Sequence, residues 1–426
     1  MEGMEGSEGI KRTEGVDGTG GIDGTEGTGG INGMERDGKM TFPMSNRIWV
    51  FTGGAHGAGG FSENRGFRNM AGLFEEVVRW DMCGQELSGR ENFVFNTARA
   101  GYCVEDILRE FQGRVACYRP FAVVYVPGEE DRGLSREALC GGLDLLRQRT
   151  EAIGARLIVV PDGDGTRDSL EEANRLLETV GAYRSKVEAG TANRLALEPA
   201  GETFPCSGRI SLKAEPMKWL FVGDSITHGA WHTFGYDSVT QLWEKYIRED
   251  WGRRDDTVLN TGVSGATASE FLARLDTRYE PYADADVVVI MFGTNDCCFP
   301  GVIDRALFKA QLGGIVDMVR ARGSQAVLRA PQPQREDAGE RATAIVPFVQ
   351  AVREVAREKN VPLVDHFQNF SALQRECPEA FLALMSDAVH PNIRGHYRMF
   401  REMAYALDMV LEDSMVSLDY PVSAES

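Results

Sequence analysis

The chain has 426 residues, of which 42% are hydrophobic, so it can form two domains of ordinary size with a packed core in each. Its 64 acidic and 46 basic residues give a formal net charge of -18. This charge disfavours nucleic acid and anionic membranes as partners, because both attract concentrated Lys and Arg side chains. A small neutral molecule is the partner that the composition favours.

Eight cysteines are scattered along the chain without the CxxC or Cys/His spacing of a zinc site. Such a pattern indicates reduced thiols in a cytosol. The first residues lack the pattern of a secretory signal, and no apolar run approaches the roughly 18 residues of a membrane span. We therefore expect a cytoplasmic protein that needs no metal or other cofactor and contacts no membrane.

Residues 1–42 consist largely of Glu-Gly, Asp-Gly and Thr-Gly steps and contain almost no large apolar side chain. Such a segment cannot offset the entropy cost of ordering by burying apolar surface. The composition therefore predicts a disordered, solvated tail.

After this tail, short apolar runs alternate with segments of helical periodicity, and the alternation occurs twice. In the second half the apolar runs cover residues 219–222, 258–259, 287–292, 326–330 and 361–364, and helical spacing is clear at 269–275 and 348–357. Strands that alternate with helices form a parallel sheet covered by helices on both faces. The sequence therefore predicts two three-layer α/β/α domains, residues 43–206 and 207–426.

The two halves can be aligned with each other. Residues 122–128 match residues 287–293 at an offset of 165, and four further pairs match at an offset of 164. These pairs are Asn96 with Asn260, Gly101 with Gly265, Leu108 with Leu272, and Arg114 with Arg278. Because strands and helices stay in phase over this span, we predict an internal duplication.

The first copy lacks the reactive side chains of the second. Ala55 falls where Ser225 lies in the second copy, and an alanine cannot be a nucleophile. Glu130 replaces Asn295, which puts a charged acceptor in the place of a donor. We predict that residues 43–206 form a degenerate domain without catalytic residues. It would bind a glycan or a partner, or pack against the second domain as one subunit packs against another.

Four short blocks in the second half carry side chains suited to ester chemistry: residues 223–226, 260–265, 293–296 and 387–390. The first three follow predicted strands, and the fourth lies on a late loop. Active residues of an open parallel sheet gather beyond the carboxyl ends of its strands, so the blocks should converge. Together they offer a serine hydroxyl, donors for an oxyanion, and a histidine with a nearby carboxylate, which is what acyl transfer requires.

With these blocks in this order, residues 215–410 resemble the SGNH, or GDSL-type, serine hydrolase family of esterases and lipases. The resemblance implies flavodoxin-like domains with parallel central sheets. It also implies that Ser225 is the nucleophile and that His390 is the general base, oriented by Asp387. The oxyanion hole would consist of the backbone N–H groups of Ser225 and Gly265 and the side-chain amide of Asn295. The family resemblance implies no cofactor.

Polar residues beside the catalytic blocks have structural interpretations. Asn260 and Asp296 would brace the loops through side-chain to backbone hydrogen bonds, with direct substrate contact as the alternative. The carboxylate of Asp224 would support the turn that carries the serine.

The remaining histidines compete with His390 for the role of base. His228 and His232 lie within seven residues of Ser225 and could in principle accept its proton. Pocket lining or surface exposure fits them better, because the last block already supplies a base. His366 and His396 have no such neighbourhood, and we interpret them as structural.

The resulting functional hypothesis is a serine hydrolase that cleaves a carboxylic ester, with a short acyl or acetyl ester of a carbohydrate or other small alcohol as the favoured substrate. An O-acyltransferase to a sugar hydroxyl, a lysophospholipase or a thioesterase would use the same residues. A protein that binds glycans or a partner through its degenerate first domain is the alternative of another class. The sequence leaves the oligomeric state open.

Overall fold

The computed structural model describes residues 47–54, 68–81, 91–160, 203–229, 232–233, 235–298 and 303–411. All of them belong to one unit of the chain, residues 42–426. The predicted tail, residues 1–42, lies outside the described residues, and so does Ala55. No helix of the described part is long and apolar enough to cross a membrane.

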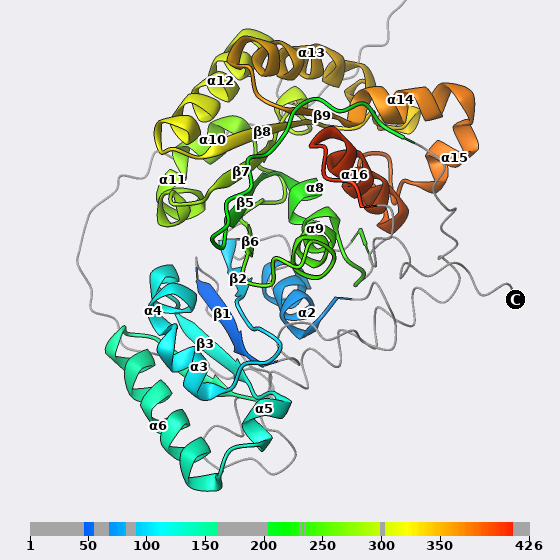
Figure 1. Ribbon diagram of the computed structural model, residues 1–426. Coiled ribbons are helices and arrows are strands. Elements are labelled where there is room, and N and C mark those ends of the chain that lie inside the picture. The colour runs from blue at the N-terminus through cyan, green and yellow to red at the C-terminus, as the bar shows by residue number, and fades with distance from the viewer. Residues whose placement is uncertain are drawn as a thin grey trace, which may run out of the picture. The chain divides into compact units, whose positions relative to one another are not determined.

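Two parallel sheets form the frame of this unit (Figure 1). The first half forms a 4-stranded sheet in the order β2-β1-β3-β4, with β1 (Ile48–Gly53), β2 (Phe93–Asn96), β3 (Ala122–Val126) and β4 (Arg156–Val159). The second half forms a 5-stranded sheet in the order β6-β5-β7-β8-β9, with β5 (Lys218–Gly223), β6 (Thr257–Asn260), β7 (Val287–Met291), β8 (Gln325–Ala330) and β9 (Leu363–Asp365). The central strands are buried, as in sheets covered on both faces. The predicted α/β class with parallel sheets is confirmed.

Helices connect the strands in both halves. Those of the first half are α2 (Met70–Glu76), which continues into the π-helical turn η1 (Val77–Asp81), then α3 (Val104–Arg109), α4 (Phe111–Arg114), η3 (Ala116–Tyr118), α5 (Glu129–Arg132) and α6 (Arg136–Ala152). Those of the second half are α8 (Ser225–His228), α9 (Val239–Lys245), the π-helical turn η4 (Tyr246–Asp250), α10 (Ala268–Ala273), α11 (Leu275–Arg278), η5 (Glu280–Tyr282), η6 (Asp296–Cys298), α12 (Arg305–Ala321), η7 (Glu336–Ala338), α13 (Arg341–Lys359), α14 (His366–Glu376), α15 (Pro378–Ala383) and α16 (Ile393–Ala406).

Several boundaries differ from the sequence prediction, and two of the differences have a clear physical reason. The helix predicted at residues 269–275 divides into α10 and α11, because Arg274 between them leaves helical geometry (φ -127°, ψ 33°). The last strand begins at Leu363 rather than at Val361. Pro362 accounts for this late start, since proline has no N–H to donate to the ladder. Its carbonyl still accepts a hydrogen bond from the Leu328 N–H at 2.9 Å.

Alternate residues of the second sheet belong to two different hydrophobic cores. Leu220 of β5 belongs to a core that includes buried residues of α12 and α13, whereas Trp219 belongs to a core that includes α9 and α16. The first of these cores continues into the first half of the chain. There, Phe93 and Phe95 contact Tyr282 edge to face, with ring centroids 6.4 and 5.2 Å apart. The two halves therefore share buried apolar surface.

The elements of the two halves correspond one to one over most of their length. Strands β1, β2 and β3 pair in the same order and register as β5, β6 and β7. Helix α2 and turn η1 correspond to α9 and η4 at an offset of 169 residues, and α3 corresponds to α10 at an offset of 164. We propose on this basis that the halves arose by duplication.

Contacts between the halves are reciprocal. Arg79 of η1 donates to the Gly262 carbonyl, and Arg248 at the corresponding position of η4 donates to the carbonyl of Ala98, which corresponds to Gly262. In the same way Arg278 pairs with Glu91 at 2.7 Å, and Arg114 pairs with Asp255 at 2.7 Å. Each contact from one half to the other therefore has a counterpart in which the two halves have swapped roles. This is the pattern of a two-fold symmetric dimer interface, here within one chain.

Glu130 lies where the alignment predicts it. The next residue, Asp131, accepts hydrogen bonds from the Gly128 and Val104 N–H groups at 2.8 and 2.9 Å. In the second half Asp296, which follows Asn295, accepts from the Gly293 and Ala268 N–H groups at 2.9 and 2.8 Å. The same turn therefore presents Glu130 in the first half and Asn295 in the second, which supports our proposal that the first copy is degenerate.

Candidate active site

The nucleophile candidate lies on a tight turn between a strand and a helix. Strand β5 ends at Gly223, and helix α8 begins at Ser225. A Cβ at Gly223 would meet Thr227 Oγ1 at 2.3 Å and the Met291 carbonyl oxygen at 2.6 Å, so only glycine fits this turn. Asp224 caps the helix by accepting from the Ile226 N–H at 3.0 Å. The turn therefore holds Ser225 at the first helical position, where a backbone N–H has no partner within the helix.

A chain of hydrogen bonds joins Ser225 to a histidine and a carboxylate. Ser225 Oγ lies 2.9 Å from His390 Nε2, and His390 Nδ1 lies 2.9 Å from Asp387 Oδ2. Asp387 Oδ1 also accepts from the N–H groups of Val389 and His390, both at 2.7 Å. Burial opposes the charge of Asp387, but these hydrogen bonds and the nearby imidazole hold the pKa of its carboxyl well below its usual value. An ionised Asp387 can orient His390 to take the serine proton.

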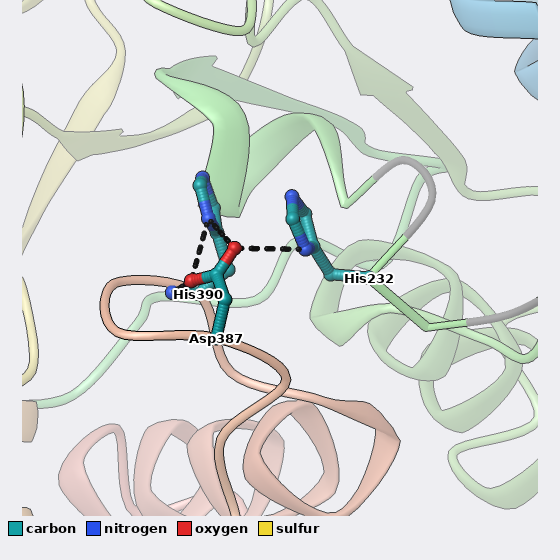
Figure 2. Close-up of side chains that lie close together, drawn as sticks. All are labelled: His232, Asp387 and His390. Atoms are coloured by element: carbon teal, nitrogen blue, oxygen red, sulfur yellow. Dashed lines mark hydrogen bonds and ion pairs between the residues drawn. The ribbon is translucent and has the colours of Figure 1, made fainter. Parts of the chain in front are cut away.

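A second histidine lies flat on the first. The ring of His232 stacks on that of His390 with centroids 3.7 Å apart and planes 6° apart. Its Nδ1 atom lies 3.6 Å from Asp387 Oδ2 (Figure 2). Burial, and then the neighbouring His390, lowers the pKa of His232 to about 3. His232 thus lines the site as a neutral ring.

Among the described residues, the side chains of His232, Asp387 and His390 form the group that could bind a metal ion. Their possible ligand atoms lie within 4.8 Å of one another. Both ring nitrogens of His390 are already engaged, one by Ser225 and the other by Asp387. A cation would have to displace the Asp387 contact. The donor set therefore fits proton transfer better than metal binding, and the absence of a cofactor stays a prediction.

The donors predicted for an oxyanion lie on the loops that follow β5, β6 and β7, the first of which carries Ser225. One is the backbone N–H of Ser225. A second is the N–H of Gly265, which has φ +87° and, among the described residues, no hydrogen-bond acceptor. The third is the side-chain amide of Asn295, which uses one N–H on the Ala266 carbonyl at 3.0 Å and keeps the other available. Such donors are suited to stabilising an oxyanion.

These elements match a known family. The model of the GDSL-like Lipase/Acylhydrolase family matches residues 221–398, a segment that contains Ser225, Gly265, Asn295, Asp387 and His390. Residues 221–398 form a GDSL-like acylhydrolase domain.

Comparisons with individual proteins cover less than half of the chain. An uncharacterized protein of Mycoplasma pneumoniae is 38% identical over 110 residues, which are 25% of this chain and 12% of that protein. The chain thus spans only a small part of this relative. Among solved structures, the acetyl xylan esterase AlAXEase is 20% identical, with 45% of this chain and 100% of that one covered and a TM-score of 0.40. The acetylxylan esterase Axe2 from Geobacillus stearothermophilus is 22% identical, with 45% and 94% covered and a TM-score of 0.38.

Polar residues brace the loops of the GDSL-like domain in the predicted way. Asn260 donates to the Thr227 carbonyl at 2.9 Å and accepts from the Gly262 N–H at 3.0 Å. Asp296 binds two backbone N–H groups, as described above, and burial raises its pKa to about 6. Both side chains thus make the side-chain to backbone hydrogen bonds expected of structural residues.

The other histidines of the GDSL-like domain are buried and have partners other than Ser225. His228 Nδ1 lies 2.8 Å from Ser264 Oγ. His396 Nδ1 accepts from the Val239 N–H at 3.3 Å. His366 lies between Arg329, whose Nε donates to its Nε2 at 3.0 Å, and Glu402, which lies 2.5 Å from its Nδ1. The structural interpretation of His366 and His396 is in keeping with these contacts.

Arg341, the first residue of α13, is a functional candidate that sequence reasoning missed. Its Nη2 atom donates to the Thr294 carbonyl at 2.8 Å and to Asn295 Oδ1 at 3.1 Å. By binding the oxygen of the Asn295 amide, it orients the N–H groups of that amide. Arg341 lies 46 residues beyond Asn295 and in none of the four blocks, so no sequence signal marks it.

Proposed function

We propose that the GDSL-like domain is a serine hydrolase that cleaves a carboxylic ester through an acyl intermediate on Ser225. The observation that carries this proposal is the continuous hydrogen-bond chain from Ser225 Oγ through His390 to Asp387, with 2.9 Å at each step. The family of this domain, with its lipases and acylhydrolases, supports the same chemistry.

In the proposed reaction, Ser225 Oγ attacks the carbonyl carbon of the ester while its proton passes to His390 Nε2. Asp387 accepts the hydrogen bond from Nδ1 and stabilises the imidazolium that forms. The negative charge on the former carbonyl oxygen is stabilised by the N–H groups of Ser225, Gly265 and Asn295. One such donor contributes about 3 kcal/mol to transition-state stabilisation.

The tetrahedral intermediate then collapses. The bond to the alcohol oxygen breaks, and His390 returns its proton to this leaving group. A water molecule next attacks the acyl-Ser225 ester, with His390 again as the base, and the carboxylic acid leaves as Ser225 regains its proton.

For the substrate we propose a short acyl ester of a carbohydrate or other small alcohol. The net charge of -18 favours a neutral substrate over an anionic one. An O-acyltransferase, a lysophospholipase or a thioesterase would place the same residues in the same roles. Cytoplasmic location stays a prediction from the sequence.

Labelling with a serine-reactive fluorophosphonate tests the proposed nucleophile. We expect the wild type to be labelled and Ser225→Ala not to be. Ser269→Ala is a matched control. Ser269 Oγ donates a hydrogen bond to Gln311 at 3.0 Å, and Ser269 has none of the catalytic or oxyanion-binding roles proposed above. Equal labelling of wild type and Ser225→Ala, or no labelling of the wild type, would contradict the proposal.

A further inference from the structure

Two buried arginines of the first half contact loops of the second half that carry active-site residues. Arg68 and Arg79 have side chains that are 1% and 0% exposed. A buried guanidinium must be paired and hydrogen-bonded, so the partners of these groups are part of the structure of the site. Each arginine has an acidic partner in its own half and carbonyl partners in the other.

Arg79 holds the loop of residues 260–265. One nitrogen of its guanidinium pairs with Glu75, and another donates to the Gly262 carbonyl. On its other side the Gly262 peptide lies against the nucleophile helix, where a Cβ would meet the His228 nitrogen and Thr227 Cγ2, each at 2.8 Å. This peptide is thus clamped between Arg79 and helix α8. The oxyanion donor Gly265 lies three residues further on the same loop.

Arg68 contacts described residues on both sides of His232, namely Gly229, Thr233 and Tyr236. Its Nη2 atom donates to the Gly229 carbonyl at 2.5 Å and to Thr233 Oγ1 at 3.0 Å, and its Nε atom donates to the Tyr236 carbonyl at 2.9 Å. Its Nη1 atom pairs with the buried Glu76 at 3.0 Å. Because His232 stacks on His390, Arg68 supports one side of the catalytic imidazole through these residues.

We propose that Arg68 and Arg79 are positioning residues for catalysis, so that the first half of the chain completes the active site of the second. This inference rests on the function proposed above. It assigns the degenerate half a role in the reaction, in place of an independent binding role. Without Arg79, the Gly262 carbonyl would lose its buried donor, and the loop would have to shift to find another.

The reciprocal contacts of the two halves supply a matched control. Arg248 pairs with Glu244 at 2.9 Å and donates to the Ala98 carbonyl, as Arg79 pairs with Glu75 and donates to Gly262. Loss of either guanidinium removes the same kind of buried contact from the same interface. Only the contact of Arg79 lies on a catalytic loop.

The test compares Arg79→Met and Arg248→Met in the full chain, with p-nitrophenyl acetate as the probe substrate. Active sites are counted by fluorophosphonate titration, and stability is measured by urea denaturation. We expect Arg79→Met to lower kcat about tenfold to a hundredfold with KM little changed, since small displacements of catalytic groups have effects of this size. Arg248→Met should lose comparable stability while its kcat stays close to that of the wild type.

Equal kcat losses in the two variants, or none in either, would overturn the positioning role. If Arg79→Met does not fold, Arg79→Lys and Arg248→Lys give the same comparison, because a lysine keeps the charge but lacks the planar fork that reaches both partners. Failure of the proposed function is a distinct result, since it would show as full labelling and activity in Ser225→Ala whatever the arginine variants do.

Discussion

His232, beside the proposed catalytic base His390, is held in its neutral form. His232 is enclosed on the face of His390, and burial with the adjacent imidazole lowers its pKa to about 3. A neutral ring can cover His390 without repelling the imidazolium that forms during the reaction. The ionised Asp387, for its part, favours that imidazolium. The imidazole of His390 thus contacts a neutral ring on one face and a carboxylate at its Nδ1 atom.

The lowered pKa of His232 predicts a contribution to stability that is lost in acid. Unfolded, this histidine takes up a proton near pH 6.5, whereas in the folded chain it stays neutral down to about pH 3. Over that window the unfolded state binds more protons, so the free energy of unfolding falls as the pH falls. His232→Phe keeps an aromatic ring and removes the titration. We expect its stability, measured by urea denaturation, to decrease less steeply between these pH values.

The other buried histidines still titrate in His232→Phe and serve as an internal reference, because burial also holds the pKa values of His366 and His396 below the usual range. Some acid sensitivity should therefore persist in the variant. An unchanged slope against pH would show that His232 is not held neutral.

The sequence blocks predicted side chains that the structure joins by hydrogen bonds, because each block combines a polar residue with the small or capping residues that its turn requires. The proximity of Ser225, Asp387 and His390 could be predicted in this way, and their roles in catalysis stay a prediction. The stacking of His232 could not be predicted, since it depends on a segment held by Arg68, 164 residues earlier in the chain. Contacts of buried charged residues that are so far apart in the chain leave no local sequence pattern from which they could be predicted.

At the scale of elements, the start of α13 and the turn η6 together orient the amide of Asn295, which we propose as an oxyanion donor. Helix α13 begins with Arg341, which donates to the Thr294 carbonyl and to Asn295 Oδ1. The turn that presents Asn295 is itself closed by Asp296. The Asn295 amide is therefore positioned by the first residue of α13 and by the turn that Asp296 closes. Both lie beyond the carboxyl ends of parallel strands.

Arg341→Met should lower kcat by about tenfold or more while leaving KM little changed, because the amide of Asn295 would lose the contact that orients it. Steady-state kinetics on p-nitrophenyl acetate measures both constants. Arg305→Met is the control, because Arg305 likewise contacts α13, through Glu354 and the Pro347 carbonyl, but within the described residues makes no hydrogen bond with the turn of residues 293–296. Similar kcat values for the two variants would contradict a role for Arg341 in orienting Asn295.

Strands were predictable from apolar runs because parallel strands are buried on both faces. Helix limits were less predictable. The break at Arg274 has no glycine or proline to announce it, and it follows from the way α10 and α11 pack beside the other half, where Arg274 and Arg278 both pair with Glu91. Tertiary contacts decided this boundary.

At the scale of the whole described unit, the halves meet as two subunits of a dimer would. Each half also contains an ion pair at corresponding positions, but with the charges exchanged. Arg68 pairs with Glu76 in the first half, and Asp237 pairs with Lys245 in the second. We propose that this exchange accompanied the loss of chemistry in the first half. Arg68 could then bind carbonyl groups of the catalytic half, while the corresponding Asp237 cannot donate in return.

The most direct test of the proposed acyl-Ser225 intermediate is to trap and locate the acyl group. The full chain is mixed with p-nitrophenyl acetate, quenched in acid within the first turnover and analysed by peptide mass spectrometry. We expect one acetyl group per chain, on the peptide that contains Ser225, and none in Ser225→Ala. An acetyl group on a residue of the first half, or turnover without any acetylated Ser225, would contradict a single catalytic centre that works through an acyl-serine.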